Sequence, residues 1–288
     1  MAKINVVAAI PAYNAAKTLP RLLDELIQQN YDEIFVLDDA SSDATIKVAK
    51  SYGSKVRVIA GKQNVGSGAN RNRIIGQTEP AIIHFIDADM LLLSKDTPNI
   101  IRKLEWPKDA AYIGGVVRNP DGTQNPFNYG PRPHILTGIF QGSLQFLVWQ
   151  VGYINKKFAK FLRGLLAPLV RGLPNIYAVP QARRVHWIAE SNMLVKSDQF
   201  AQYGGFDPRF RYSEIGDLAL RVHRRNLHGY FTPEIDAVHA SLDNVLRSGK
   251  KRYVAHKQFL EKHGKLSFYF PPLSDYLETR KTQKRYHR

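Results

Sequence analysis

The stretch that decides the fold is AIIHFIDADM, residues 81–90. Apart from His84, its first six residues are apolar, which predicts a strand buried on both faces. The strand runs into Asp87-Ala88-Asp89, and because side chains alternate along a strand, both carboxylates should lie on the same side at its carboxyl end. Ligands of open α/β sheets bind at that end, and paired carboxylates suit Mg²⁺ or Mn²⁺. An isolated Asp-x-Asp is more often a turn.

Three apolar runs before this stretch predict further strands, at residues 4–10, 34–37 and 56–59. A helix is predicted between the first two runs, because leucine and isoleucine recur at helical spacing within residues 19–27. This alternation of strands and helices predicts an α/β fold with a mostly parallel sheet and helices on both faces.

Two segments that follow the predicted strands are candidate ligand contacts. Asp39 comes after the second strand, where its carboxylate can accept a hydrogen bond from a base N–H or a ribose hydroxyl. Capping of the next helix is the alternative for Asp39, but Ser42 and Asp43 are better placed to do that. The loop at residues 61–76 is glycine-rich and basic, but it fits neither the P-loop nor the dinucleotide spacing. Its Arg71 could reach a phosphate or simply be solvated.

The positive charge lies outside the predicted sheet. The formal net charge is +16, with no acidic residue between Asp121 and Glu190, and with 12 Lys and Arg against four Asp and Glu from Ser241 onward. Such patches suit an anionic partner such as a membrane surface, nucleic acid or polyphosphate. A nucleic-acid-binding protein is disfavoured, because the charge avoids the motif-bearing sheet. The absence of Cys excludes disulfides and permits an intracellular site.

A middle segment has the pattern of a membrane-surface element. Residues 135–154 carry no charge over 20 positions, but their Gln, Gly, Ser and Thr are polar for a bilayer span. Next comes an apolar stripe at helical spacing, bordered by basic residues. The stripe is Phe158, Phe161, Leu162, Leu165, Leu166 and Leu169, and the basic residues are Lys156, Lys157, Lys160 and Arg163. Pro168 should kink or end this helix. The acid-free context favours contact with anionic lipid over packing on the chain's own domain.

The motifs resemble those of family-2 glycosyltransferases of the GT-A fold. AIPAYN, VLDDASSDAT, the Asn64-x-Gly66 loop with Arg71, and FIDADM are similar to the nucleotide-sugar half of that family. The stretch WIAESNMLVKSDQFAQYGGFDPRFRYSEIGDLALRVHRR, followed by YFTPEIDAVHAS, resembles the acceptor half of the rhamnosyl- and galactofuranosyltransferase-like branch. The resemblance covers residues 4–240, and five motifs in order make it specific.

This resemblance implies a Rossmann-like architecture in which the chain is divided into successive parts. Residues 1–117 would form the nucleotide-sugar half, and residues 118–240 the acceptor half with the amphipathic insertion at about 135–183. Residues 241–288 would form a basic, helical C-terminal tail used at the membrane. The implied activity is metal-dependent, inverting transfer of a sugar from a nucleotide-sugar donor to a lipid-linked or cell-envelope glycan, with Mn²⁺ or Mg²⁺ as cofactor. The implied location is peripheral, at the cytoplasmic face of the cell membrane, with no nucleic acid as partner.

Carried over position by position, the resemblance implies a donor pocket and a metal site. The donor pocket would comprise Pro11, Tyr13 and Asp39 at the nucleobase and ribose, Arg71 at the base or diphosphate, and Asp87 at the ribose and metal. Asp89 would hold the metal directly, and His239 would be a further metal or diphosphate ligand.

The sequence departs from the family at the catalytic base. The branch carries its base as an Asp in a Glu-Asp-x-Asp-Leu motif that opens a helix, and here Ile215 stands in that slot. Glu214 or Asp217 could serve instead, the acceptor could need little help, or the chain could be a catalytically silent nucleotide-sugar-binding module. Glu214 is favoured, because Asp217 could simply interact with the first turn of the helix. Glu190 replaces a small residue and is either a substitute acid or a buried partner of an arginine.

Overall fold

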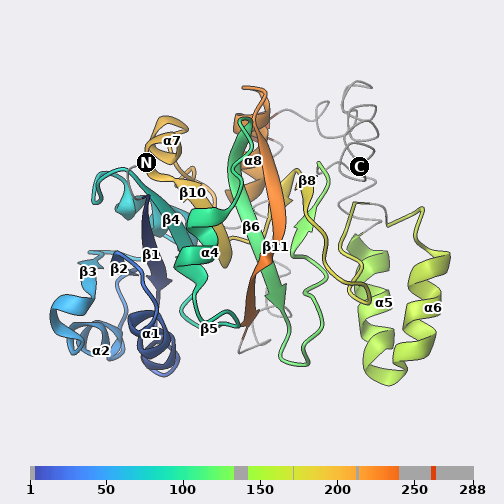
Figure 1. The fold of residues 1–288 in the computed structure, drawn as a ribbon, viewed down its shortest axis with the longest axis horizontal. Helices are drawn as coiled ribbons and strands as arrows, with labels where there is room; N and C mark the ends of the chain where they lie inside the picture. The colour runs from blue at the N-terminus through green and yellow to red at the C-terminus, as the bar shows by residue number, and fades with distance from the viewer. Residues whose placement is uncertain (1–3, 133–141, 171, 212–213, 240–260, 264–288) are drawn as a thin grey trace.

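The computed structural model describes residues 4–132, 142–170, 172–211, 214–239 and 261–263. At its centre, these residues form a mixed sheet of nine strands (Figure 1). The strands are β1 (Asn5–Ala12), β2 (Glu33–Asp38), β3 (Arg57–Ala60), β4 (Ala81–Ile86), β5 (Met90–Leu92), β6 (Ala110–Arg118), β8 (Arg183–Val185), β10 (Asn192–Lys196) and β11 (His228–His239). Their order is β3-β2-β1-β4-β10-β6-β11-β5, and β8 pairs with β11.

Most strands of this sheet run in one direction. β1 is parallel to β2 and β4, β2 to β3, and β6 to β11. β10 lies antiparallel between β4 and β6, so these two also share a direction, while β5 and β8 run opposite to β11. The expected α/β fold with a mostly parallel sheet is confirmed, and the four strands expected from the sequence are β1 to β4. The carboxyl ends of β1, β2, β4, β6 and β11 therefore meet at one edge, where such sheets bind ligands.

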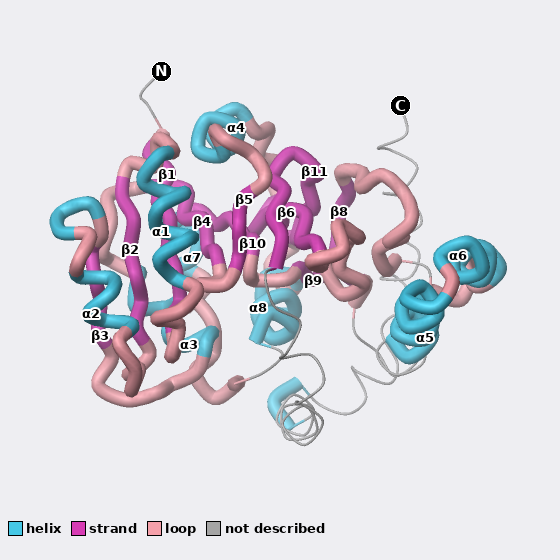
Figure 2. Tube along the Cα trace, turned by 90° about the horizontal axis from the view of Figure 1, so that it is seen from below, coloured by secondary structure: helices cyan, strands magenta, loops and turns pink. Residues whose placement is uncertain are grey.

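Helices cover both faces of the sheet, as expected, with α4 on one side and α8 on the other (Figure 2). They are α1 (Leu19–Gln28), α2 (Thr45–Lys50), α3 (Ser67–Arg71), α4 (Thr97–Lys103), α7 (Ser197–Gln202) and α8 (Glu214–His223), with short 3₁₀ helices at Gly53–Lys55 and Asn72–Ile74. Ala8 and Ile10 of β1 pack with α1 and α2, and Val7 and Ala9 pack with α7 and α8. Successive side chains of β1 point to opposite faces, which is why the whole strand is apolar.

A pair of helices stands beyond β8 at one end of the sheet, as both views show (Figures 1 and 2). These are α5 (Gly142–Ile154) and α6 (Lys156–Leu165), and a small second sheet of β7 (Tyr129–Gly130) and β9 (Trp187–Ile188) lies at the same end. α6 ends before Pro168, as the sequence predicted. No helix among the described residues combines the length and the apolar composition that crossing a bilayer requires. Residues 135–141 and most of the tail at 241–288 lie outside the described residues.

α6 turns its large apolar side chains outward. Phe161 and Leu165 are each 67% exposed, and Phe158 is exposed beside them. Its buried face carries Ala159 and Arg163 instead. Arg163 was expected among the charges that border the apolar stripe, and it is in fact buried against the segment that follows the helix.

Candidate active site

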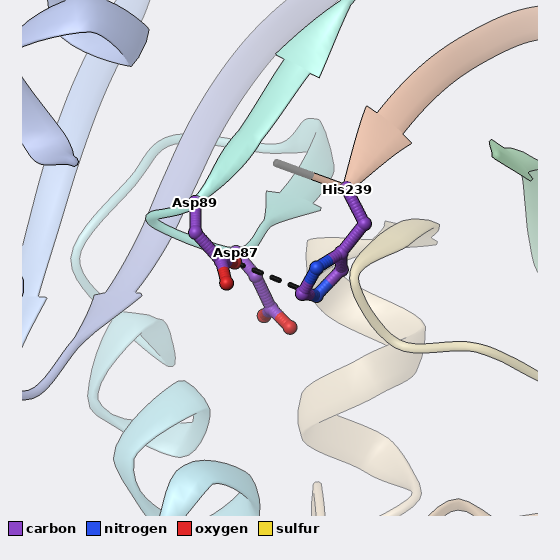
Figure 3. Close-up of side chains that lie close together, drawn as sticks. All are labelled: Asp87, Asp89 and His239. Atoms are coloured by element: carbon purple, nitrogen blue, oxygen red, sulfur yellow. Dashed lines mark ion pairs between the residues drawn. The ribbon is translucent and has the colours of Figure 1, made fainter. Parts of the chain in front are cut away.

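Pairing of β5 with β11 creates a cluster of possible metal ligands at the carboxyl edge of the sheet. Met90 lies opposite His239 in this ladder, so that Asp89, one residue earlier, comes to lie near the histidine. The amide of Met90 donates to the carbonyl oxygen of Asp87, closing a turn that places Asp87 beside them. One ligand atom from each of Asp87, Asp89 and His239 lies within 4.8 Å of the others, and Figure 3 shows the three side chains converging.

This cluster has the chemistry of a divalent-cation site. It offers two carboxylates and one imidazole, and His239 Nε2 lies 3.5 Å from an oxygen of Asp89. Oxygen ligands suit Mg²⁺ and Mn²⁺, and imidazole is a further ligand for a transition metal such as Mn²⁺. The three residues implied for the metal by the resemblance are therefore together, and the donor set fits such an ion.

Arg71 fixes the first of these carboxylates. Its side chain is 2% exposed, and its guanidinium donates to Asp87 at 2.6 Å and to the Ser67 hydroxyl at 2.5 Å. The rings of Phe85 and Phe206 lie 5.9 and 6.0 Å from the guanidinium carbon. A buried cation is costly unless it is paired, so the contact with Asp87 holds both side chains in place. Arg71 is therefore buried and paired rather than solvated, and its expected contact with the base or diphosphate stays a prediction.

Asp39 ties the glycine-rich loop to the end of β2. Its carboxylate is buried, and its two oxygens accept hydrogen bonds from the amides of Val65 and Gly66, both at 2.9 Å. Arg73 Nη2 lies 3.6 Å from one of these oxygens. Asp39 does not cap the next helix, because Asp43 accepts from the amide of Thr45 there. This loop contact could not be predicted from the sequence, because nothing in the residue spacing indicates which strand end the loop approaches.

The remaining donor-pocket candidates lie at the end of β1. Pro11 is buried within the strand, and Tyr13, just beyond it, is exposed. The amide of Asp39 donates to the carbonyl of Ala12 at 2.8 Å, so β1 and β2 present Tyr13 and Asp39 at the same edge. An exposed aromatic ring beside a carboxylate is suited to stacking on a base.

Two glutamates lie close together behind the metal cluster. Burial raises the pKa of Glu190 to about 8, repulsion by Glu214 adds to this, and Arg71 opposes it. Burial also raises the pKa of Glu214, which opens α8. A carboxylate oxygen of Glu190 accepts a hydrogen bond from the Ile215 amide at 3.2 Å. The Glu190 carboxylate therefore lies at Ile215, the residue that replaces the usual base. The charge of Arg71 also acts on Glu190 and opposes the rise in its pKa. The structure thus agrees with both alternatives for Glu190, a substitute acid and a partner of an arginine.

Asp217 has a different environment, although it lies on the same helix. It is fully buried, and it accepts hydrogen bonds from Arg221 at 2.8 Å, Lys262 at 2.5 Å and His263 at 2.8 Å. Burial alone would raise its pKa, but the bonds from His263, Lys262 and Arg221 outweigh it and lower the pKa to about 2. Asp217 thus anchors Lys262 and His263 to α8.

Comparison with known proteins gives the family. The family model described as glycosyl transferase family 2 matches residues 7–166, more than half of the chain. The chain belongs to glycosyl transferase family 2. The expected rhamnosyltransferase-like branch, and a nucleotide-sugar-dependent glycosyltransferase as the class of enzyme, are confirmed with it.

Family-2 relatives and solved structures agree with this assignment. The N-acetylglucosaminyl-diphospho-decaprenol L-rhamnosyltransferase of Mycobacterium tuberculosis is 25% identical over 267 residues, which cover 85% of this chain and 78% of that protein. Mannosyltransferase PcManGT from Pyrobaculum calidifontis, solved with GDP-Man and Mn²⁺, has a TM-score of 0.58 at 17% identity over 92% of this chain. TarS 1–349 of S. aureus, solved with UDP-GlcNAc, has a TM-score of 0.52 at 15% identity over 88% of this chain. The match covers 66% and 65% of those two solved chains, and it confirms the GT-A fold.

Proposed function

We propose that this chain is a metal-dependent, inverting glycosyltransferase that moves a sugar from a nucleoside-diphosphate donor to a lipid-linked or cell-envelope glycan. The observation that carries the proposal is the convergence of Asp87, Asp89 and His239 at the sheet edge that also carries Asp39. Two structural relatives were solved with GDP-Man and Mn²⁺ and with UDP-GlcNAc, and the mycobacterial relative is named for a diphospho-decaprenol acceptor.

The donor would bind across the ends of β1, β2 and β4. Tyr13 and Asp39 would hold the base and ribose, and the loop that Asp39 fixes would close over them. Asp87, Asp89 and His239 would hold Mn²⁺ or Mg²⁺, which as a Lewis acid offsets the charge that develops on the leaving diphosphate. Arg71 keeps Asp87 oriented for this role, so its contribution is to preorganise the site.

The acceptor hydroxyl must lose a proton as it attacks, and we assign that step to Glu190 and Glu214 acting as a pair. Two buried carboxylates next to each other do not both ionise readily, so the pair retains a proton up to a higher pH than a solvated acid does. A base of raised pKa is well matched to proton abstraction near neutral pH. The hydrogen bond from the Ile215 amide holds Glu190 at the slot where the branch carries its base. A single displacement assisted by this pair inverts the sugar carbon.

The chain would act at the cytoplasmic face of the cell membrane, as a peripheral protein. The exposed stripe of α6 supports this, because Phe161 and Leu165 project from a helix that also bears exposed Lys156, Lys157 and Lys160. A helix with an unpartnered apolar face and basic flanks is typical of binding to anionic lipid.

A thermal-shift panel of nucleoside diphosphates, with and without Mn²⁺, tests the proposal. One nucleotide class should raise the melting temperature in the presence of metal, and Asp89→Ala should abolish that rise. Glu79→Ala is the matched control, because it removes an exposed carboxylate elsewhere on the chain. Stabilisation of Asp89→Ala equal to that of wild type, without need of metal, would reject the site. The silent-module alternative predicts donor binding without transfer, unaltered by Ile215→Asp.

A further inference from the structure

A cavity lies between α6 and the small sheet. Its volume is about 430 Å³, within the range of small-molecule sites. Arg163 of α6 and Arg183 of β8 line it, together with Tyr129 of β7 and the polar side chains of Gln124 and Asn175. The described residues that line it include no Asp or Glu. The cavity is therefore polar and cationic.

The two arginines of this cavity lack the partners that buried cations usually have. Arg163 is 6% exposed, its Nε has no hydrogen-bond partner, and its other contacts are 3.5 Å long, to the carbonyls of Leu173 and Pro174. The Nε of Arg183 is also buried without a partner, and its guanidinium carbon lies 5.3 Å from the Tyr129 ring centre. Burial lowers the pKa of Arg163. Among the described residues, neither guanidinium forms an ion pair with a carboxylate.

An anion from outside the chain would resolve this imbalance. Buried charge is costly when it is unpaired, and the sequence supplies no acid between Asp121 and Glu190. Arginine pairs well with phosphate, because its planar fork can donate two parallel hydrogen bonds. Two such side chains lining one cavity match a phosphate or diphosphate better than a carboxylate of one charge.

The surroundings of the cavity indicate what carries the phosphate. On one side, Gln124 bridges to Arg118, which lies opposite Val238, the neighbour of His239. Gln124 and Val238 are therefore two strand spacings apart, about 10 Å. The cavity thus adjoins the edge of the sheet that carries His239. On the other side, Val179 at the cavity is 84% exposed, and α6 displays its apolar stripe. A ligand that joins both sides would have an apolar chain, a phosphate, and a group that reaches the reaction centre.

We propose that this cavity binds the diphosphate ester that links the acceptor sugar to its lipid, with Arg163 and Arg183 as the contacts. The inference rests on the proposed function for the class of acceptor, and it adds the site that recognises it. The lipid chain lies along the exposed face of α6, and the sugar points to the end of β11.

Calorimetric titration of the full chain with farnesyl diphosphate tests this site, in EDTA so that the metal-dependent donor site does not contribute. Arg183→Gln and Arg163→Gln should each weaken binding at least about tenfold, as loss of a charged hydrogen bond does. Lys50→Gln removes the same charge from an exposed position on α2, outside the cavity and α6, and should change binding less than about twofold. Farnesol, which lacks the diphosphate, should bind far more weakly than farnesyl diphosphate.

Two comparisons make the result decisive. Arg183 is less buried than Arg163, so replacing Arg183 disturbs folding less. Arg183→Gln should still bind a nucleoside diphosphate with Mn²⁺ as wild type does. Loss of the acceptor site and loss of the donor site are thus measured separately. Wild-type affinity for farnesyl diphosphate in both arginine variants would overturn the proposal. If Arg183→Gln also weakened binding of the chain to phosphatidylglycerol vesicles by the same factor, the proposal would be overturned, since the arginine would then be a general contact for lipid headgroups.

Discussion

At the scale of single residues, carboxylates in one region of the chain differ because of their neighbours. Burial and the neighbouring Glu214 raise the pKa of Glu190, whereas hydrogen bonds from His263, Lys262 and Arg221 lower the pKa of Asp217. The sequence offered both Glu214 and Asp217 for the base and favoured Glu214, because Asp217 could simply interact with the first turn of the helix. The contacts that separate them come from Glu190 and from residues 261–263, which the local motif does not reveal.

Glu190→Gln should lower kcat by roughly a hundredfold, the usual scale for loss of a general base, with little change in the donor KM. Wild-type kcat should rise with pH through about 8, because the pair acts when deprotonated, and this rise should disappear in the variant. Steady-state kinetics against pH measures both. A Glu190→Gln enzyme with the wild-type rate and pH profile would remove Glu190 from catalysis.

Asp217 should matter for stability through its charge. Its pKa is lowered in the folded state, so its contribution is full above about pH 4 and is lost as the pH falls through about 2. Asp217→Ala removes the shared acceptor of Arg221, Lys262 and His263 and should reduce the free energy of unfolding by roughly 1.5–3 kcal/mol, the scale of hydrogen bonds to a charged group. Urea unfolding at pH 7 measures this, with exposed Asp24→Ala as the control. A loss below about 1 kcal/mol would contradict the anchoring role.

At the scale of elements, the sequence predicted where strands and helices lie along the chain more reliably than which of their side chains are buried. The spacing of the apolar residues predicted α6 and its end before Pro168. The same spacing could not show that Phe161 faces outward and Arg163 inward, because periodicity defines a stripe and not what covers it. β5 was missed, since its three residues are too few to form a pattern.

The outward stripe of α6 should mediate membrane binding. Phe161→Asp with Leu165→Asp should reduce co-sedimentation with phosphatidylglycerol vesicles at least about tenfold, because both side chains project from the helix. Ile4→Asp is the matched control, since it changes an exposed apolar residue that lies outside α6, just before β1. Equal vesicle binding by the double variant and wild type would show that another surface makes the contact.

At the scale of the whole molecule, the catalytic edge depends on a contact between distant parts of the chain. Asp87 and Asp89 follow β4, and His239 ends β11. Their proximity arises because β5 pairs with β11. Figure 3 shows the side chains of Asp87, Asp89 and His239 lying close together as a result. The order of motifs, read through the resemblance to the family, pointed to these residues. Spacing alone could not, since strand pairing at long range leaves no local pattern.

The central claim is that a divalent cation held by this cluster binds the donor's diphosphate. The most direct measurement is an anomalous difference map at the manganese edge, from crystals grown with Mn²⁺ and the nucleoside diphosphate that stabilises the chain most. The account predicts one peak bonded to Asp89, Asp87 or His239, and to an oxygen of the diphosphate. A bound nucleotide with no manganese between it and these side chains would contradict it.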